Sequence, residues 1–388
     1  MQHMQNQNII SSIKNKSDVT NNIPSRTTKR GLMPLVLAFI VGMALIPWKL
    51  GHAATANPIK WHPGHYSILV GDPNNPNLMR QVYNELTETP ALRGVVIRYD
   101  WSTLEKSPGV YNFAPIDARL KELAAKKKRL IVLLEAKSFD KTKIVPSYLL
   151  TAKYDGGVFP IGKYGSNTVN GYNLKLWNSA LKERMAALIT ALGKRYDSNP
   201  YFEGFGLQET ALGDPVKPIT NTQIDGYYKN LTALNKHMRA QFPHTMVFQY
   251  TNYPRPEIKP IIDNLKATGG TLAATDIFLD DPGLNYKGTP PGVYTYFAKN
   301  AGSMPLAAQV ERPNYLDTRH DGRGYKPTVA QLLNFARDNL HVNYLFWTRT
   351  PEIFPRVLEV LRGKAQKATP SGGLPAGCPK SYQSCKNN

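Results

Sequence analysis

The sequence holds only two cysteines and is short of acidic residues. Two cysteines among 388 residues exclude a disulfide-built scaffold, and no group of Cys and His has the spacing of a metal site. The 28 acidic residues against 48 basic ones leave a formal net charge of +20, which fits an acidic partner or plain solubility. A hydrophobic content of 41% is enough for a large core and excludes wholesale disorder.

The first 56 residues have the pattern of an export signal. A basic segment ends at Lys29-Arg30, an apolar run extends from Leu32 to Pro47, and small residues follow at 53–56. The apolar run suits a signal peptide and is short for a membrane span. We expect cleavage before Asn57, with an uncleaved membrane anchor as the alternative. Either way, residues 57–388 are predicted to be secreted or periplasmic.

The last 25 residues, 364–388, carry no acidic residue and show no apolar periodicity, which predicts a flexible basic tail. Cys378 and Cys385 flank six residues there and are expected to close a small loop in an oxidising compartment. Five units of the net charge belong to the export segment and four to this tail, which leaves a net charge of +11 for residues 57–363.

Residues 57–363 alternate short apolar runs with helical patterns, which is typical of βα units around a parallel sheet. Helical periodicity covers 115–127, 176–196, 224–242 and 329–340. Eight strands are expected, at 65–70, 94–99, 130–134, 202–208, 246–250, 276–279, 306–310 and 344–347. This count favours a single (β/α)8 TIM barrel. The alternative, an open doubly wound sheet, lacks its Gly-rich phosphate loop after the first strand.

In such a barrel, functional residues follow the C-terminal ends of the strands. Carboxylates, amides and aromatic residues dominate these positions. Aromatic rings stack on sugars, and acetal cleavage requires one carboxylic acid and one carboxylate. Glu209 and Glu311 follow the fourth and seventh strands, whose ends face each other across the mouth. A helix cap or a surface ion pair is the alternative reading of either residue alone.

The segment from Trp101 to Phe113, WSTLEKSPGVYNF, resembles the segment after strand two in clan A glycoside hydrolases. GKRYDSNP at 193–200 is similar to the segment before the acid/base strand of that clan. The resemblance spans roughly residues 61–362. It implies a retaining (β/α)8 glycosidase with Glu209 as acid/base and Glu311 as nucleophile. It also implies that Trp347 lies under the sugar at the cleavage point, and a Trp buried in the core is the alternative.

One position departs from the clan. Gln208 precedes Glu209 where the clan has an Asn that contacts the sugar 2-hydroxyl, so this contact is either kept by a longer amide or lost. The other predicted substrate-binding residues share a place at or near strand ends: Arg98, Asp100, Trp101, Glu135, Lys137, Gln249, Asn252, Tyr253 and Asp280. An inward Arg98 is expected to hold a catalytic carboxylate.

The sequence therefore predicts an exported retaining glycosidase that cleaves O-glycosidic bonds, β-linked by resemblance, in an oligo- or polysaccharide. An anionic glycan is one option for the substrate. No cofactor, metal or nucleic acid is expected, any membrane contact runs through the uncleaved signal, and the protein is expected to be a monomer. The alternative is a non-catalytic carbohydrate-binding barrel that assists polysaccharide export or modification.

Overall fold

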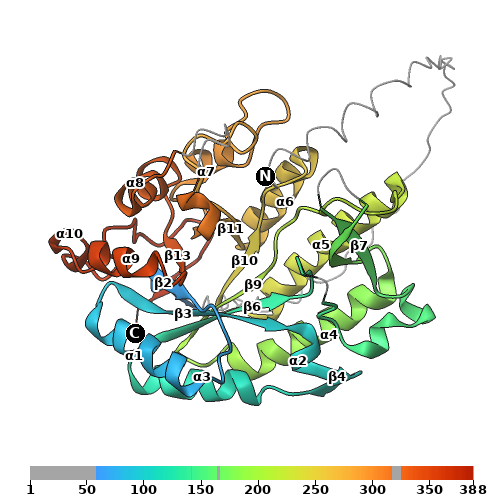
Figure 1. The fold of residues 1–388 in the computed structure, drawn as a ribbon, viewed down its shortest axis with the longest axis horizontal. Helices are drawn as coiled ribbons and strands as arrows, with labels where there is room; N and C mark the ends of the chain where they lie inside the picture. The colour runs from blue at the N-terminus through green and yellow to red at the C-terminus, as the bar shows by residue number, and fades with distance from the viewer. Residues whose placement is uncertain (1–57, 141, 164–166, 317–324, 388) are drawn as a thin grey trace, which may run out of the picture.

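The computed structural model describes residues 58–140, 142–163, 167–316 and 325–387 (Figure 1). Eight parallel strands close into a barrel with helices around it, which confirms the predicted (β/α)8 fold. The predicted export segment 1–56 lies outside the described residues. Among the residues described, no helix is long and apolar enough to cross a membrane.

The barrel strands pair in chain order, and the last pairs with the first. They are β2 (Gly64–Ile68), β3 (Leu92–Asp100), β6 (Arg129–Glu135), β9 (Phe202–Leu207), β10 (Met246–Tyr250), β11 (Thr271–Ala274), β12 (Leu306–Val310) and β13 (Tyr344–Thr348). Glu209 and Glu311 thus follow the fourth and seventh strands, as predicted from the sequence.

Helices cover the outside of the barrel and connect its strands. They are α1 (Pro76–Glu88), α2 (Trp101–Leu104), α3 (Ala114–Ala125), α4 (Ser179–Tyr196), α5 (Asn221–Gln241), α6 (Arg255–Thr268), α7 (Tyr294–Asn300), α8 (Val329–Asn334), α9 (Phe354–Leu361) and α10 (Lys364–Lys367). Two antiparallel hairpins lie outside the barrel: β4 (Glu105–Ser107) with β5 (Val110–Tyr111), and β7 (Val158–Gly162) with β8 (Val169–Leu174).

The apolar residues form two cores, one on each side of the barrel wall. The larger lies between strands and helices, and the smaller fills the barrel with rings such as those of Tyr66, Phe248 and Phe346. A side chain at Gly206 would collide with the Phe248 ring, because an added Cβ would lie only 2.1 Å from it. Side chains therefore fill the barrel interior, and a site is expected at the C-terminal ends of the strands.

The sixth strand differs from the prediction. The sequence favoured 276–279, where Ile277 and Phe278 are large and apolar, but β11 is formed by Thr271–Ala274. Small residues suit this position because they pack against the equally small Ala307 and Ala308 of β12. Ile277 and Phe278 are buried beyond the strand end. The shift moves the polar strand end from Asp280 to Asp276.

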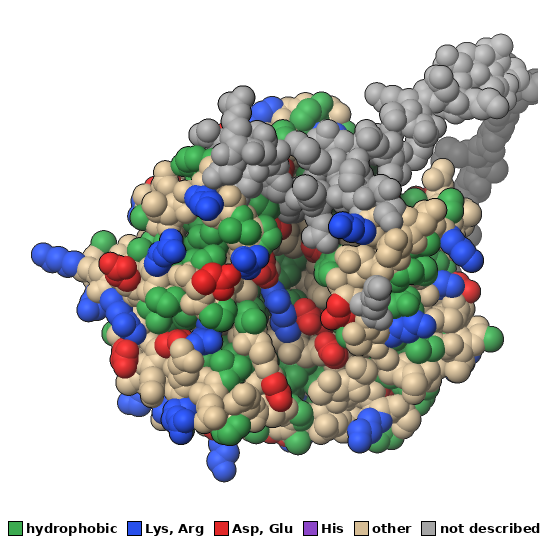
Figure 2. Space-filling model, in the orientation of Figure 1, with side chains coloured by type: hydrophobic (Ala, Val, Ile, Leu, Met, Phe, Trp, Pro, Cys, Tyr) green, Lys and Arg blue, Asp and Glu red, His purple; other side chains and the backbone are tan. Residues whose placement is uncertain are grey.

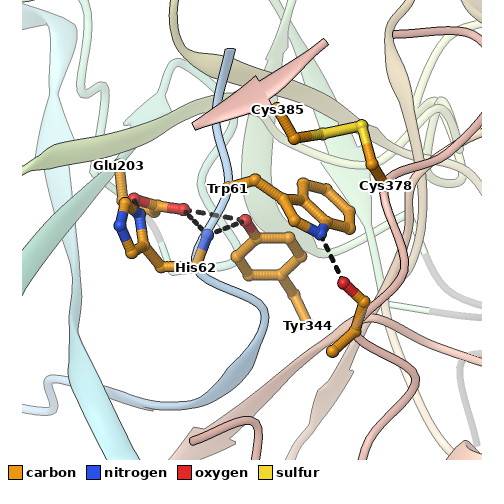
Figure 3. Close-up of a disulfide and its surroundings, with 7 residues drawn as sticks. Trp61, His62, Glu203, Tyr344, Cys378 and Cys385 are labelled. Carbon is orange, nitrogen blue, oxygen red and sulfur yellow. Dashed lines mark hydrogen bonds and ion pairs between the residues drawn. A yellow bond between two sulfur atoms is a disulfide. The ribbon is translucent and has the colours of Figure 1, made fainter. Parts of the chain in front are cut away.

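Residues 364–387 are not a flexible tail. Their β14 (Cys385–Lys386) pairs in parallel with β1 (Ile59–Lys60), and Cys378 and Cys385 form a disulfide. The Trp61 indole (Figure 3) donates to the Ala376 carbonyl, and the Tyr382 ring packs edge-on against Trp61. The basic composition suggested disorder, but a few apolar residues, Leu374 and Tyr382 among them, anchor the segment under the barrel.

Candidate active site

A cavity of about 500 Å³ opens where the barrel strands end. Figure 2 shows a hollow near the centre of this face, with acidic and basic side chains around it. Its charged lining residues are Arg98, Asp100, Glu135, Lys137, Asp140, Glu209, Asp276 and Glu311. Six carboxyl groups against two cations make the described lining acidic, in contrast to the basic chain as a whole.

Glu311 is held by a network of donors. Its Oε1 accepts from Arg98 Nη2 at 2.5 Å and from Gln309 Nε2 at 2.5 Å. The Tyr250 hydroxyl donates in turn to Gln309 Oε1 at 2.7 Å, which fixes the orientation of that amide. Burial acts to lower the pKa of the Arg98 guanidinium, but Glu311 and Glu135 outweigh it and the pKa is raised. Arg98 therefore stays charged beside the two carboxyl groups.

Glu135 ends β6 and shares Arg98 with Glu311. Its Oε1 lies 3.6 Å from Arg98 Nε and 3.5 Å from Gln208 Nε2. Burial raises the pKa of Glu135 to about 7; Arg98 opposes this effect, and Asp100, Glu311 and Asp140 add to it. A carboxyl that titrates near neutral pH within a cavity is a candidate for proton transfer.

Glu209 lies beside the buried ammonium group of Lys137. Lys137 Nζ is 3.7 Å from Glu209 Oε1 and donates to the backbone carbonyls of Glu209 and Ala211. The other carboxylate oxygen, Oε2, accepts from Asn252 Nδ2 at 3.3 Å. Burial lowers the pKa of Lys137, and Glu209 acts in the opposite direction. Asn252 is thus buried behind the site and orients Glu209.

Gln208 uses its amide on the protein itself. Its Oε1 accepts from the backbone N–H groups of Ala136 and Lys137 at 2.8 and 2.7 Å, and its Nε2 donates to the Lys137 carbonyl at 2.8 Å. The amide therefore ties the end of β9 to the chain after β6. It is not free to take the sugar contact that the Asn of the clan makes, although Gln208 borders the cavity.

Six predicted binding residues do not line the cavity: Asn252, which lies behind Glu209, and five others. Trp101 and Trp347 are fully buried in the core; their indole N–H groups donate to Glu105 Oε2 and His65 Nδ1. Tyr253 and Gln249 are also buried, and Gln249 donates to the Tyr250 carbonyl. Asp280 follows the segment 276–279, which was predicted to be the sixth strand but is not part of it. It does not line the cavity. The predicted sugar platform at Trp347 is absent because its ring packs inside the barrel wall.

Several residues that line the cavity are not predicted by the sequence pattern. Asp276 was placed inside a strand, and correct placement of β11 would have revealed it. Tyr250 and Gln309 are the last inward residues of β10 and β12, and the sequence places both at strand ends without predicting a role for them. Phe139 lies in the loop after β6 and keeps 43% of its surface exposed at the cavity. No periodic signal marks such a loop residue.

No family model and no curated protein matches the chain. Solved structures do match it. The catalytic domain of a β-amylase from Paenibacillus polymyxa is 8% identical, with a TM-score of 0.54 over 78% of this chain and 98% of that one. A β-galactosidase from the psychrophilic Marinomonas ef1 is 10% identical, with a TM-score of 0.53 over 81% of this chain and 61% of that one. At these identities the likeness establishes the fold, the barrel that the resemblance to clan A implied.

Proposed function

We propose that this protein is an exported retaining glycoside hydrolase that cleaves O-glycosidic bonds, β-linked ones in particular, in an oligo- or polysaccharide. The observation that carries the proposal is that Glu209 and Glu311, at the ends of the fourth and seventh strands, border one cavity. The barrel fold shared with a β-amylase and a β-galactosidase supports it. Fold alone would not, because one barrel hosts many chemistries.

Glu311 is the proposed nucleophile. A nucleophile must be fixed in orientation, and Arg98 and Gln309 donate to Glu311 Oε1 while the Asn314 backbone N–H also donates to the carboxylate. The carboxylate held in this way is proposed to attack the anomeric carbon. Glu209 is the second carboxyl of the pair, to which the resemblance assigns acid/base catalysis. Retention requires that the two carboxyl groups act from opposite faces of the sugar.

The lining also bears on the substrate. Phe139 offers an exposed ring on which a sugar face can stack, with Tyr250 and Phe278 deeper in the cavity. The excess of carboxyl groups disfavours an anionic sugar at the cleavage point, because like charges repel at short range. We therefore propose a neutral or amino sugar there, even though the exterior of the protein is basic.

Hydrolysis of a panel of polysaccharides, with product anomers followed by proton NMR, tests the proposal. Wild-type protein lacking residues 1–56 is expected to release products of retained configuration. Glu311→Gln is expected to lower kcat by about 10⁴-fold or more while substrate binding persists, because the carboxylate acts in the transition state. Glu209→Gln tests the other member of the pair. Equal activity of wild type and Glu311→Gln would refute the assigned nucleophile.

The same panel addresses the alternative of a carbohydrate-binding barrel. Binding of a glycan without hydrolysis, unchanged by Glu311→Gln, would favour that alternative. Gln208 bears on this alternative, because its amide contacts the protein backbone and is not free for the sugar contact that the Asn of the clan makes. Export is tested separately, by the N-terminal sequence of the protein recovered from the cell exterior or periplasm, which is expected to begin at Asn57.

A further inference from the structure

The three glutamates of the cavity are held in different ways. Resting on the proposed glycosidase function, we propose that Glu135 is the general acid, whose proton goes to the departing glycosidic oxygen, and that Glu209, whose two oxygens face Lys137 and Asn252, contacts the sugar instead. The assignment departs from the fourth-strand position that the resemblance implied. It follows from which oxygens of each carboxyl group are already in contact with donors.

Both oxygens of Glu209 face groups that only donate. Lys137 Nζ lies near Oε1, and the Asn252 amide donates to Oε2. A protonated carboxyl would place a hydroxyl against one of these donors, and its proton would have no acceptor there. The carboxylate form satisfies both contacts. Glu209 is thus suited to accept a sugar hydroxyl or to stabilise positive charge, and unsuited to carry a proton to the leaving group.

Glu135 has the opposite arrangement. Arg98 Nε and the Gln208 amide contact only its Oε1, at 3.6 and 3.5 Å. Among the described residues no donor lies on Oε2. The side chain borders the cavity and keeps 24% of its surface exposed. Oε2 is therefore the place where a proton can sit and face a substrate.

The surroundings of Glu135 support its neutral form. Asp100 comes from the end of β3, Asp140 from the loop after β6, Glu311 from the end of β12, and the Tyr250 hydroxyl from β10. Arg98 is the one charge that opposes them. Burial and these carboxylates together bring the pKa of Glu135 to about 7, which matches a general acid near neutral pH.

Arg98 also sets the span between acid and nucleophile. Its Nε faces Glu135 and its Nη2 faces Glu311, so one planar guanidinium carries both carboxyl groups. The distances of 3.6 and 2.5 Å from these two nitrogens keep the two Oε1 atoms no more than about 8.5 Å apart. Pairs of glycosidase carboxyls span about 5 to 9.5 Å, so a glycosidic bond fits between these two.

The steps balance as a double displacement. As a Glu311 carboxylate oxygen bonds to the anomeric carbon, the bond from that carbon to the glycosidic oxygen breaks, and the Glu135 proton passes to this oxygen. A water then attacks the anomeric carbon and gives a proton to Glu135, and the bond to Glu311 breaks. Both carboxyl groups return to their starting forms.

Leaving-group dependence tests the assignment, because a substrate that leaves readily needs no acid. The probes are phenyl and 2,4-dinitrophenyl glycosides built on the oligosaccharide that the polysaccharide panel releases. Glu135→Gln is expected to lower kcat/KM for the phenyl glycoside by about 10² to 10⁴-fold and to affect the dinitrophenyl glycoside less than tenfold. Glu209→Gln is the matched control and is expected to lower both values by the same factor.

The reverse pattern, with dependence on the leaving group in Glu209→Gln and not in Glu135→Gln, would overturn the assignment and leave the proposed function standing. An absence of hydrolysis by the wild type would defeat the proposed function instead. Carbon NMR of protein with labelled glutamate carboxyls gives a readout without substrate. A carboxyl titrating near pH 7 is expected to shift or vanish in Glu135→Asp and to persist in Glu209→Gln. A wild-type protein with no such carboxyl would contradict the assignment.

Discussion

The two ends of the barrel both contain buried charge, but they use it differently. At the closed end, beneath the strands, Glu203 is fully buried and accepts from the His62 N–H, the His62 ring and the Tyr344 hydroxyl, at 2.7 to 2.8 Å (Figure 3). At the open end, Glu135, Glu209 and Glu311 keep 22 to 24% of their side-chain surface exposed. The closed end uses its hydrogen-bonding capacity on structure, and the open end leaves oxygens for a substrate.

The pKa values reflect the same division. Burial alone would raise the pKa of Glu203, but the hydrogen bond and charge of His62 and the charge of Arg129 outweigh it, so the pKa is lowered. Burial of Glu135 is not compensated in this way, and its pKa rises to about 7. Desolvation is the first cause at both ends. The donors supplied around each carboxyl decide which form is stable.

The largest expected effect comes from the closed end. Glu203→Ala removes the acceptor of three hydrogen bonds and leaves buried donors of His62 and Tyr344 without it. We expect a loss of about 3 to 5 kcal/mol in the free energy of unfolding, measured by urea denaturation. Glu311→Gln at the open end is the control, with a loss below about 1 kcal/mol. Equal losses in the two variants would show that the open end of the barrel contributes as much to stability as the closed end.

The contrast between the ends was only half visible in the sequence. Strand ends carrying Glu135, Glu209 and Glu311 could be predicted, because apolar runs followed by carboxylates have a period and a direction. The closed end could not. Glu203 lies inside the apolar run of 202–207, and its partners His62 and Tyr344 are 141 residues away on either side. Pairings at that distance depend on barrel closure, which no local pattern encodes.

Aromatic residues show the same limit. A Trp at a strand end predicts a sugar platform when the ring points along the barrel axis. The Trp347 ring instead donates to His65 within the wall, while Phe139, in an irregular loop, is exposed at the cavity. Composition also led to a wrong prediction at the C terminus. Residues 364–387 are polar, which predicted a flexible tail, but they pack against the closed end of the barrel. The direction of a side chain and the packing of a terminal segment against the barrel depend on the whole folded chain, and the local sequence does not determine them.

The second prediction concerns acid, which is expected to weaken the closed end first. Burial lowers the pKa of His65 to about 4. Its Nε2 pairs with the Gly372 carbonyl, so its Nδ1 is the acceptor for Trp347, and a second proton would break that bond. A lowered pKa stabilises the fold above the unfolded value near 6.5, and this stability is lost as pH falls toward 4. The loss amounts to roughly 3 kcal/mol by pH 4.

Urea midpoints between pH 7 and 4 measure this effect. His65→Gln is expected to be less stable than wild type at pH 7 and to show a shallower decline with acid. The titration of Glu135 runs the other way, since its raised pKa removes stability as pH increases from about 4.5 to 7. A decline as steep in His65→Gln as in wild type would place the acid-sensitive group elsewhere.

The third prediction concerns the disulfide under the barrel. Replacing Cys378 and Cys385 together by Ser opens the loop that holds β14 against β1. We expect a loss of about 2 kcal/mol in the free energy of unfolding, because a short cross-linked loop restricts the unfolded chain. Hydrolysis by the folded protein is expected to be unchanged, because the cavity is at the other end of the barrel. A fall in kcat at temperatures where the variant is fully folded would show that the two ends are coupled.

The smallest expected effect lies at the mouth and leaves the fold untouched. Phe139→Ala removes an exposed ring that borders the cavity, and little packing is lost because 43% of the side chain already faces solvent. We expect KM to rise about fivefold, the equivalent of about 1 kcal/mol of stacking, with kcat and the urea midpoint unchanged. Val110→Ala, which shortens an apolar side chain that is 58% exposed and does not border the cavity, is the control. A lowered urea midpoint in Phe139→Ala, but not in Val110→Ala, would mean that this exposed ring stabilises the fold, as the buried residues at the closed end do.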